Sequence, residues 1–175
     1  MSKNSTPEYW LRGPVPGIPA LLQPVVHALL QAQEEIHIMV INFPDELLWI
    51  QPGGKASAGF HLQHIAGVLD RMATYALKET LSELQLEYLR REGEANELIN
   101  SQNLLKHLDD TIARFINLLK HTDPATLTEF RGVGRKHLPS TTGGLLFHAA
   151  EHTMRHTGQL MITLHWLTVK DLDLS

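Results

Sequence analysis

The sequence predicts an all-α protein folded as a four-helix bundle, with one short extra helix. Apolar residues recur at helical spacing in four long segments, and residues that cap or break helices stand at the ends of these segments. The connections between the segments are of moderate length. A chain of 175 residues is expected to build one core, so we predict a single domain over residues 1–175.

The first long helix is predicted over residues 20–41. Residues 1–17 form an irregular N-terminal segment rich in proline and glycine, so a regular helix cannot begin before about Ile18. Pro24 falls in the first turn of the helix, where proline is tolerated. The tripeptide NFP at 42–44 ends the helix. Its apolar residues at helical spacing are Leu21, Leu22, Val25, Val26, Leu29, Leu30 and Ile36.

Three further helices are predicted in the middle of the chain. The first covers residues 57–77, where Ser57 can act as the N-terminal cap. A short charged helix over 82–91 ends near Gly93, and a third long helix covers roughly 101–121. The buried face of helix 57–77 is expected to contain Ile65, Val68, Met72, Tyr75 and Ala76.

The last helix follows an irregular segment. Residues 128–144 are rich in glycine and too broken for a helix, so we expect an exposed connection there. Thr141 or Thr142 then begins a helix that extends to about Val169. This helix is apolar on two sides, which is typical of a helix covered on two sides.

The second apolar side of the last helix predicts a homodimer. It carries Phe147, Met154 and Met161, which a simple bundle leaves exposed to water. Exposed apolar patches mark interfaces, and two-fold dimers are the commonest assemblies of identical chains. The alternative is that the short helix 82–91 or the N-terminal segment covers this side within one chain.

A row of histidines in the last helix indicates a metal site. His148, His152 and His156 follow one another at intervals of four residues, which places them on one side of the helix, and Gln159 and Thr163 continue the row. Imidazole is the commonest protein ligand of divalent metals. The chain contains no cysteine, so any metal site must use nitrogen and oxygen ligands.

A single inward-facing histidine is usually a hydrogen-bonded core residue and not a ligand. A row of several polar side chains is a different case, because burying each one without a partner costs a few kcal/mol. The second long helix can supply a further ligand through His61 or His64, which lie within or beside its buried face. Their positions on that helix do not distinguish between them.

A second motif overlaps the histidine row. The stretch His148-Ala-Ala-Glu151-His152 spells H-x-x-E-H, in which two histidines bind zinc and the glutamate activates water in a group of peptidases. That chemistry also requires a carboxylate further along the chain. The later acidic residues are Asp171 and Asp173 in the terminal tail, so hydrolysis is the weaker interpretation.

Composition argues against two classes of partner. The net charge is −4, and the basic residues are scattered, which is unlike a nucleic-acid-binding surface. No run of about 18 apolar residues is present to cross a membrane. The first residues lack the apolar region of an export signal, so we expect a cytoplasmic protein.

Two segments carry a family resemblance. FHLQHIAGVLDRM at 60–72 and HAAEHTMRHTGQL at 148–160 resemble the DinB superfamily, close to its YfiT-like branches, and the likeness extends from about Tyr9 to Leu167. The resemblance implies an up-down-down-up four-helix bundle that binds one divalent ion through three histidines. That ion is nickel or zinc, with iron, manganese or cobalt as alternatives.

Applied to this chain, the resemblance implies His64, His152 and His156 as the metal ligands, and so selects His64 over His61. Supporting positions around the ligands are then expected at His148, His61, Gln159 and Glu151. Many members carry an arginine where this chain has Thr157, so no role that rests on that arginine transfers to this chain.

The resemblance also implies a function. A metal held by three histidines keeps open positions for substrate, which is the layout of a catalytic site. Some relatives are metal-dependent transferases that use low-molecular-weight thiols, so we expect a small-molecule substrate and a thiol activated on the metal. The alternatives are a metal-binding or stress-response protein without turnover, and a metal-dependent hydrolase.

Overall fold

The computed structural model describes residues 6–169 and shows a bundle of long helices, as the sequence predicts. The four long helices are α1 (Gln23–Val40), α2 (Ala58–Ala76), α4 (Ser101–His121) and α5 (Thr142–Thr168). The short helix α3 (Glu83–Arg91) lies outside the bundle against α2. Short 3-10 turns occupy Tyr9–Leu11, Ala20–Leu22, Asp45–Leu47, Pro52–Gly54 and Pro124–Thr126.

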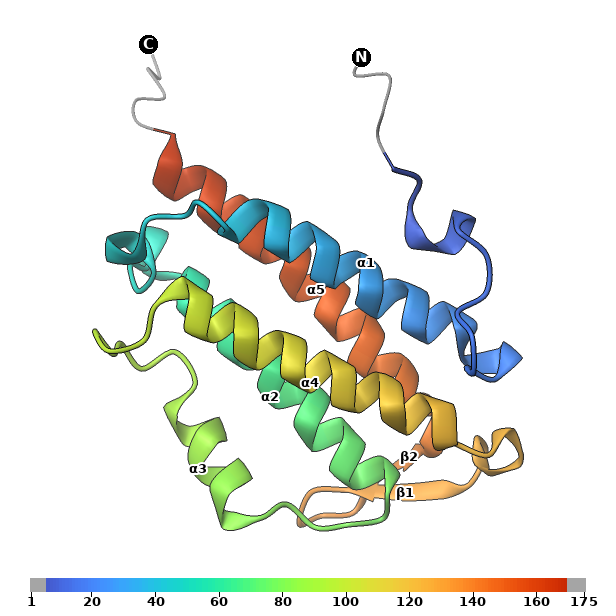
Figure 1. Cartoon of the computed structure of the whole chain (residues 1–175). Helices are drawn as coiled ribbons and strands as arrows, with labels where there is room; N and C mark the ends of the chain where they lie inside the picture. Colours follow the sequence, from blue (N-terminus) through green and yellow to red (C-terminus); the bar gives the residue numbers. More distant parts are fainter. Residues whose placement is uncertain (1–5, 170–175) are drawn as a thin grey trace.

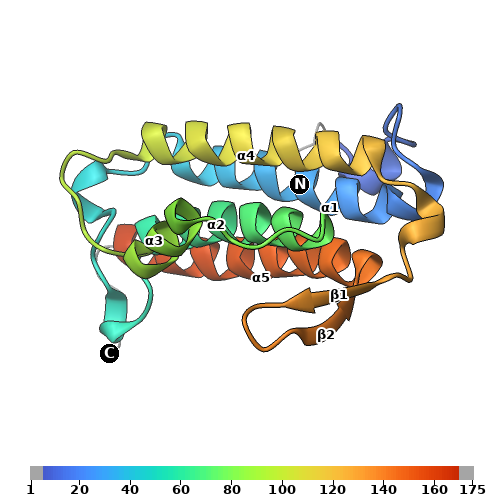
Figure 2. The same ribbon diagram turned by 90° about the horizontal axis from the view of Figure 1, so that it is seen from below.

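The long helices follow the up-down-down-up order. In Figure 1, α1 and α5 run in one direction, whereas α2 and α4 run in the other. Each long helix packs against two others: α2 contacts α5 and α4, and α1 contacts the same two. Viewed from below, α4 and α1 form one layer, and α2 and α5 form the second (Figure 2). The antiparallel pair α2 and α5 is the one that carries the histidines.

The predicted N-terminal caps of α2 and α5 agree with the structure. The Ser57 side chain accepts a hydrogen bond from the Phe60 amide at 3.1 Å, so it caps α2. The structure also decides between the two candidates for the N-cap of α5, because the Thr141 hydroxyl accepts from the Gly144 amide at 3.0 Å.

Fully buried side chains from all four long helices fill the core, among them Leu29, Ile36, Leu62, Ile65, Leu108, Phe115, Leu146 and Leu160.

Residues 128–144 are largely exposed, as predicted, but they are more regular than their composition indicates. This segment contains a β-hairpin of β1 (Phe130–Val133) and β2 (Leu138–Thr141), paired antiparallel with Phe130 opposite Thr141. The side chain of Arg131 is buried, and its Nε donates to the Ala76 carbonyl at the end of α2 at 2.8 Å. The hairpin is therefore held by a tertiary contact that the local composition does not reveal.

Among residues 6–169, no helix combines the length and the apolar content needed to cross a membrane.

The outer side of α5 remains exposed in the single chain. Phe147 is 64% exposed and Met161 is 52% exposed, and Trp166 further along the helix is also exposed. The short helix and the N-terminal segment were the two elements that could have covered this side within one chain. They lie elsewhere, because α3 packs on α2 and the first 3-10 turn packs on α1.

We therefore retain the homodimer as a prediction. Light scattering coupled to size-exclusion chromatography at micromolar concentration should give about twice the chain mass of 19.7 kDa. Changing Met161 to glutamate should shift the protein towards the monomer, because a charge would then enter an apolar interface. A wild-type mass near 19.7 kDa would overturn the prediction.

Candidate metal centre

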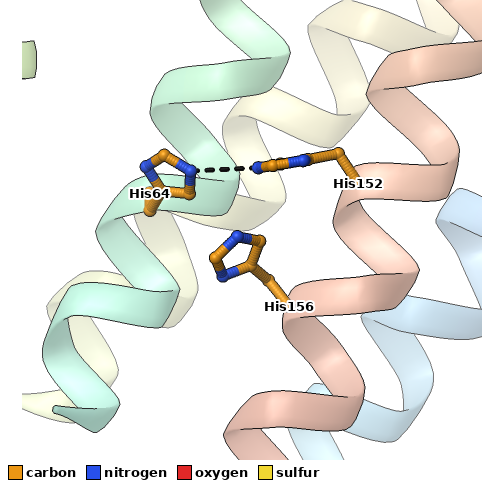
Figure 3. Close-up of side chains that lie close together, drawn as sticks. All are labelled: His64, His152 and His156. Carbon is orange, nitrogen blue, oxygen red and sulfur yellow. Dashed lines mark hydrogen bonds between the residues drawn. The ribbon is translucent and has the colours of Figure 1, made fainter. Parts of the chain in front are cut away.

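The packing of α2 against α5 brings histidines from both helices together. Because the two helices run antiparallel, His64 lies opposite His152, and His61, one turn earlier on α2, lies opposite His156. Figure 3 shows the side chains of His64, His152 and His156 converging in the space between the two helices. The cluster therefore joins residues that are 88 or more positions apart in the sequence.

Three of these histidines lie close enough together to bind one metal ion. One potential ligand atom each from His64, His152 and His156 lies within 4.8 Å of the other two. The Nε2 atoms of His64 and His152 are 3.0 Å apart. Two nitrogens bound to one ion at about 2.1 Å and at roughly 90° to 110° are separated by about 3.0–3.4 Å. The three-histidine group can therefore hold a metal ion with small adjustments.

Burial disfavours the charged form of three histidines of the cluster. Burial, and after it the positive charge that His64 can carry, lowers the pKa of His152 to about 4 and that of His156 to about 3. Burial also lowers the pKa of His61 to about 4. A neutral imidazole has a free lone pair, which is the form that binds metal.

One ring nitrogen in the cluster has no partner. Within residues 6–169, Nδ1 of His152 is buried and makes no hydrogen bond. A buried polar atom without a partner costs free energy, and a water molecule or an ion is one explanation for such an atom. The set of nitrogen donors fits a bound divalent ion, which His152 would bind through Nε2, the nitrogen that faces His64.

His61 lies behind the three-histidine group and not within it. Its Nδ1 is 3.0 Å from Nδ1 of His156, and its Nε2 is 3.5 Å from the hydroxyl of Thr163. His61 and Thr163 are both buried. This geometry favours a role in which His61 orients His156 through a hydrogen bond.

The remaining candidates in α5 lie at the exposed edge of the cluster. Nδ1 of His148 is 2.8 Å from Glu151, whose other oxygen accepts from Arg155 at 2.6 Å. His148, Glu151 and His152 form a second group whose potential ligand atoms lie within 4.8 Å of one another. Gln159 is exposed.

Glu92 and Arg71 also belong to the site, although nothing in their sequence context predicts it. Glu92 follows the last residue of α3, and its Oε2 is 2.6 Å from Nδ1 of His64. Its other oxygen accepts from Arg71 at 2.5 Å. Glu92 stands beside a run of charged residues that is typical of a solvated helix, so the sequence offers no local indication of its burial.

A comparison with protein families matches most of the chain. A family model described as the DinB superfamily matches residues 28–160, a range that contains all three histidines of the group. No curated protein is similar enough to the chain to count as a match.

Proposed function

The chain belongs to the DinB superfamily, and on this basis we propose that it binds one divalent metal ion through His64, His152 and His156. The observation that carries this proposal is the convergence of three imidazoles, from two different helices, to within 4.8 Å. Nitrogen ligands suit zinc and nickel better than magnesium or calcium, which prefer oxygen. We therefore propose nickel or zinc, with iron, manganese or cobalt as alternatives.

The exposure of the cluster supports a catalytic use. His156 is buried at 9% exposure, the His64 side chain is 20% exposed, and the His148 side chain reaches 46%. The site is thus closed on the side of His156 and open towards His148. Three protein ligands and one open side leave room for a substrate, whereas a structural metal site is closed by protein ligands.

We propose a transferase that uses a low-molecular-weight thiol and a small electrophilic substrate. A bound divalent ion lowers the pKa of a coordinated thiol and so supplies a nucleophile near neutral pH. Transfer forms a bond from sulfur to the electrophilic carbon, the leaving group departs with its electron pair, and the thiol proton passes to solvent. The chain itself contributes three imidazoles and a partly open site.

The proposal is tested in two steps. Metal analysis of the untagged protein should find about one divalent ion per chain, and a screen of thiols with electrophiles should then show metal-dependent loss of free thiol. A protein that binds no divalent ion would overturn the metal proposal. Bound metal without consumption of any thiol would overturn the transferase and favour a binding role without turnover.

One observation favours a metal-dependent hydrolase as a second candidate. The group of His148, Glu151 and His152 reproduces the H-x-x-E-H arrangement, with the glutamate beside one of the two histidines. However, Glu151 is already engaged by Arg155 at 2.6 Å, which favours a structural role for this carboxylate.

Replacement of His148 distinguishes the two groups of ligands. We expect His148→Ala to weaken metal binding by about 10- to 100-fold, because a residue that supports a ligand typically contributes that much. Affinity is measured by calorimetric titration with zinc. His165→Ala, at an exposed position of the same helix, is the control and should bind as the wild type does. Complete loss of binding in His148→Ala would instead assign the metal to the group that contains Glu151.

A further inference from the structure

Glu92 connects a metal ligand to the helix that lies outside the bundle. It is the C-cap residue of α3, and its carboxylate is 4% exposed. One oxygen faces Nδ1 of His64 at 2.6 Å, and the other accepts from Arg71 at 2.5 Å. A carboxylate buried to this degree requires partners for both of its oxygens, and these two residues supply them.

The two contacts together determine the tautomer of His64. A carboxylate paired with a guanidinium can only accept hydrogen bonds, so the proton of the neutral His64 ring must be on Nδ1. Nε2 then carries the lone pair, and Nε2 is the atom that faces His152 at 3.0 Å. The ring is thereby both oriented and prepared to bind a metal through the nitrogen that points into the cluster.

A glycine on the surface of α2 leaves space for this carboxylate. A Cβ atom added to Gly67 would lie 2.7 Å from Nη1 of Arg71 and 2.9 Å from the Tyr88 ring, and closer still to the Glu92 carboxylate. Real Cβ atoms do not make such contacts, so any larger residue at this position would force the Glu92 carboxylate or its neighbours to move. Glycine weakens a helix by about 1 kcal/mol relative to alanine, and here the close approach accounts for its presence.

We propose that Glu92 is a positioning residue of the metal centre, which holds the metal-ligating tautomer and orientation of His64. This inference rests on the metal site proposed above. Metal-ligating histidines commonly donate their second ring N–H to a carboxylate, and the loss of that carboxylate weakens binding. The structure adds that the carboxylate comes from α3, which has no buried residue of its own.

Metal binding should strengthen the attachment of α3 to the bundle. The helix is held on α2 by polar contacts, including the Tyr88 hydroxyl, which donates to the Gln63 carbonyl at 3.0 Å. If Glu92 strengthens metal binding at His64, then metal binding must strengthen the attachment of Glu92 by the same factor. Metal should therefore slow the exchange of amide hydrogens in and around α3.

The sharpest variant is Glu92→Gln. Arg71 always donates, so the amide oxygen must turn towards Arg71 and the amide NH2 towards Nδ1 of His64. Nδ1 must then accept, which moves the ring proton to Nε2 and blocks the ligand atom. We expect a 10- to 100-fold lower zinc affinity, together with a change of tautomer that imidazole 15N NMR of the metal-free protein at about pH 8 can detect.

Two more variants complete the experiment. Gly67→Ala should lower zinc affinity similarly, because the added methyl group displaces Glu92 without altering any ligand. Tyr88→Phe is the matched control: it removes another contact between α3 and α2 but leaves Glu92 in place, so zinc affinity should change less than about threefold.

The outcomes separate this inference from the proposed function. Failure of the wild type to bind zinc would overturn the metal site itself. Wild-type binding with unchanged affinity and an unchanged His64 tautomer in Glu92→Gln would overturn the role of Glu92 alone. Equal loss in Glu92→Gln and Tyr88→Phe would show that attachment of α3 matters and not the carboxylate, and would also overturn the inference. Zinc-dependent protection of the amides of residues 83–93 in the wild type, reduced in Glu92→Gln, would support it.

Discussion

Replacing His156 or His152 with alanine is expected to abolish tight binding of a divalent ion. Each supplies one of the three imidazoles that converge from α2 and α5, and two remaining ligands on opposite helices cannot hold the ion. The loss of affinity should exceed the 10- to 100-fold range that is typical of supporting residues. Titration of the metal-free protein with zinc or cobalt measures it, and circular dichroism checks that the helices remain.

The two histidines of α2 provide the control for this prediction. His64→Ala should abolish binding as well. His61→Ala should weaken it only as a supporting residue does, because His61 faces His156 and lies outside the three-histidine group. Stoichiometric, tight metal binding by both His152→Ala and His156→Ala would refute the ligand assignment. If His61→Ala and His64→Ala exchange their expected effects, the α2 ligand is His61.

Acidification is expected to destabilise the metal-free fold well above the pH at which carboxylates titrate. The pKa of His61 and His152 is about 4, and that of His156 is about 3, whereas an imidazole in the unfolded chain has a pKa of about 6.5. Between these values the unfolded chain binds more protons than the folded one, so stability falls as the pH falls. His107, whose pKa burial also lowers, acts in the same direction.

The expected size of this effect is large for a change of two pH units. From pH 7 to pH 5, the free energy of unfolding of the metal-free protein should fall by roughly 3–4 kcal/mol, after a discount for solvent screening of the partly exposed rings. Each kcal/mol shifts the melting temperature by about 2–4 °C in a domain of this size, so the melting temperature should drop by about 10 °C. Scanning calorimetry in the presence of a chelator measures it.

Two variants show whether the buried histidines cause the effect. His61→Met removes one buried imidazole while retaining an apolar side chain, so the fall with pH should become shallower. His121→Gln changes an exposed histidine of α4 and should leave the profile unchanged. A melting temperature that stays constant from pH 7 to pH 5 in the wild type would show that the cluster is not buried as the structure has it.

Local features of the sequence were sufficient to predict the helices. Helical periodicity depends on residues three and four positions apart, and caps such as Ser57 act within a few residues, so both can be read without a tertiary structure. The histidine row of α5 is local in the same sense. The family resemblance then supplied the helix order and the choice of His64. The helix order is confirmed, and the ligand set remains a prediction.

The tertiary structure decided what depends on distant parts of the chain. The hairpin is held through Arg131 and the Ala76 carbonyl, 55 positions apart, and local composition indicated only an irregular segment. Whether His61 or His64 reaches the open side of the cluster depends on how α2 is rotated against α5. Glu92 has the sequence surroundings of a solvated residue. Its carboxylate is buried between Arg71 and His64 because α3 packs over Gly67. Burial depends on the packing of distant elements, which the local sequence does not contain.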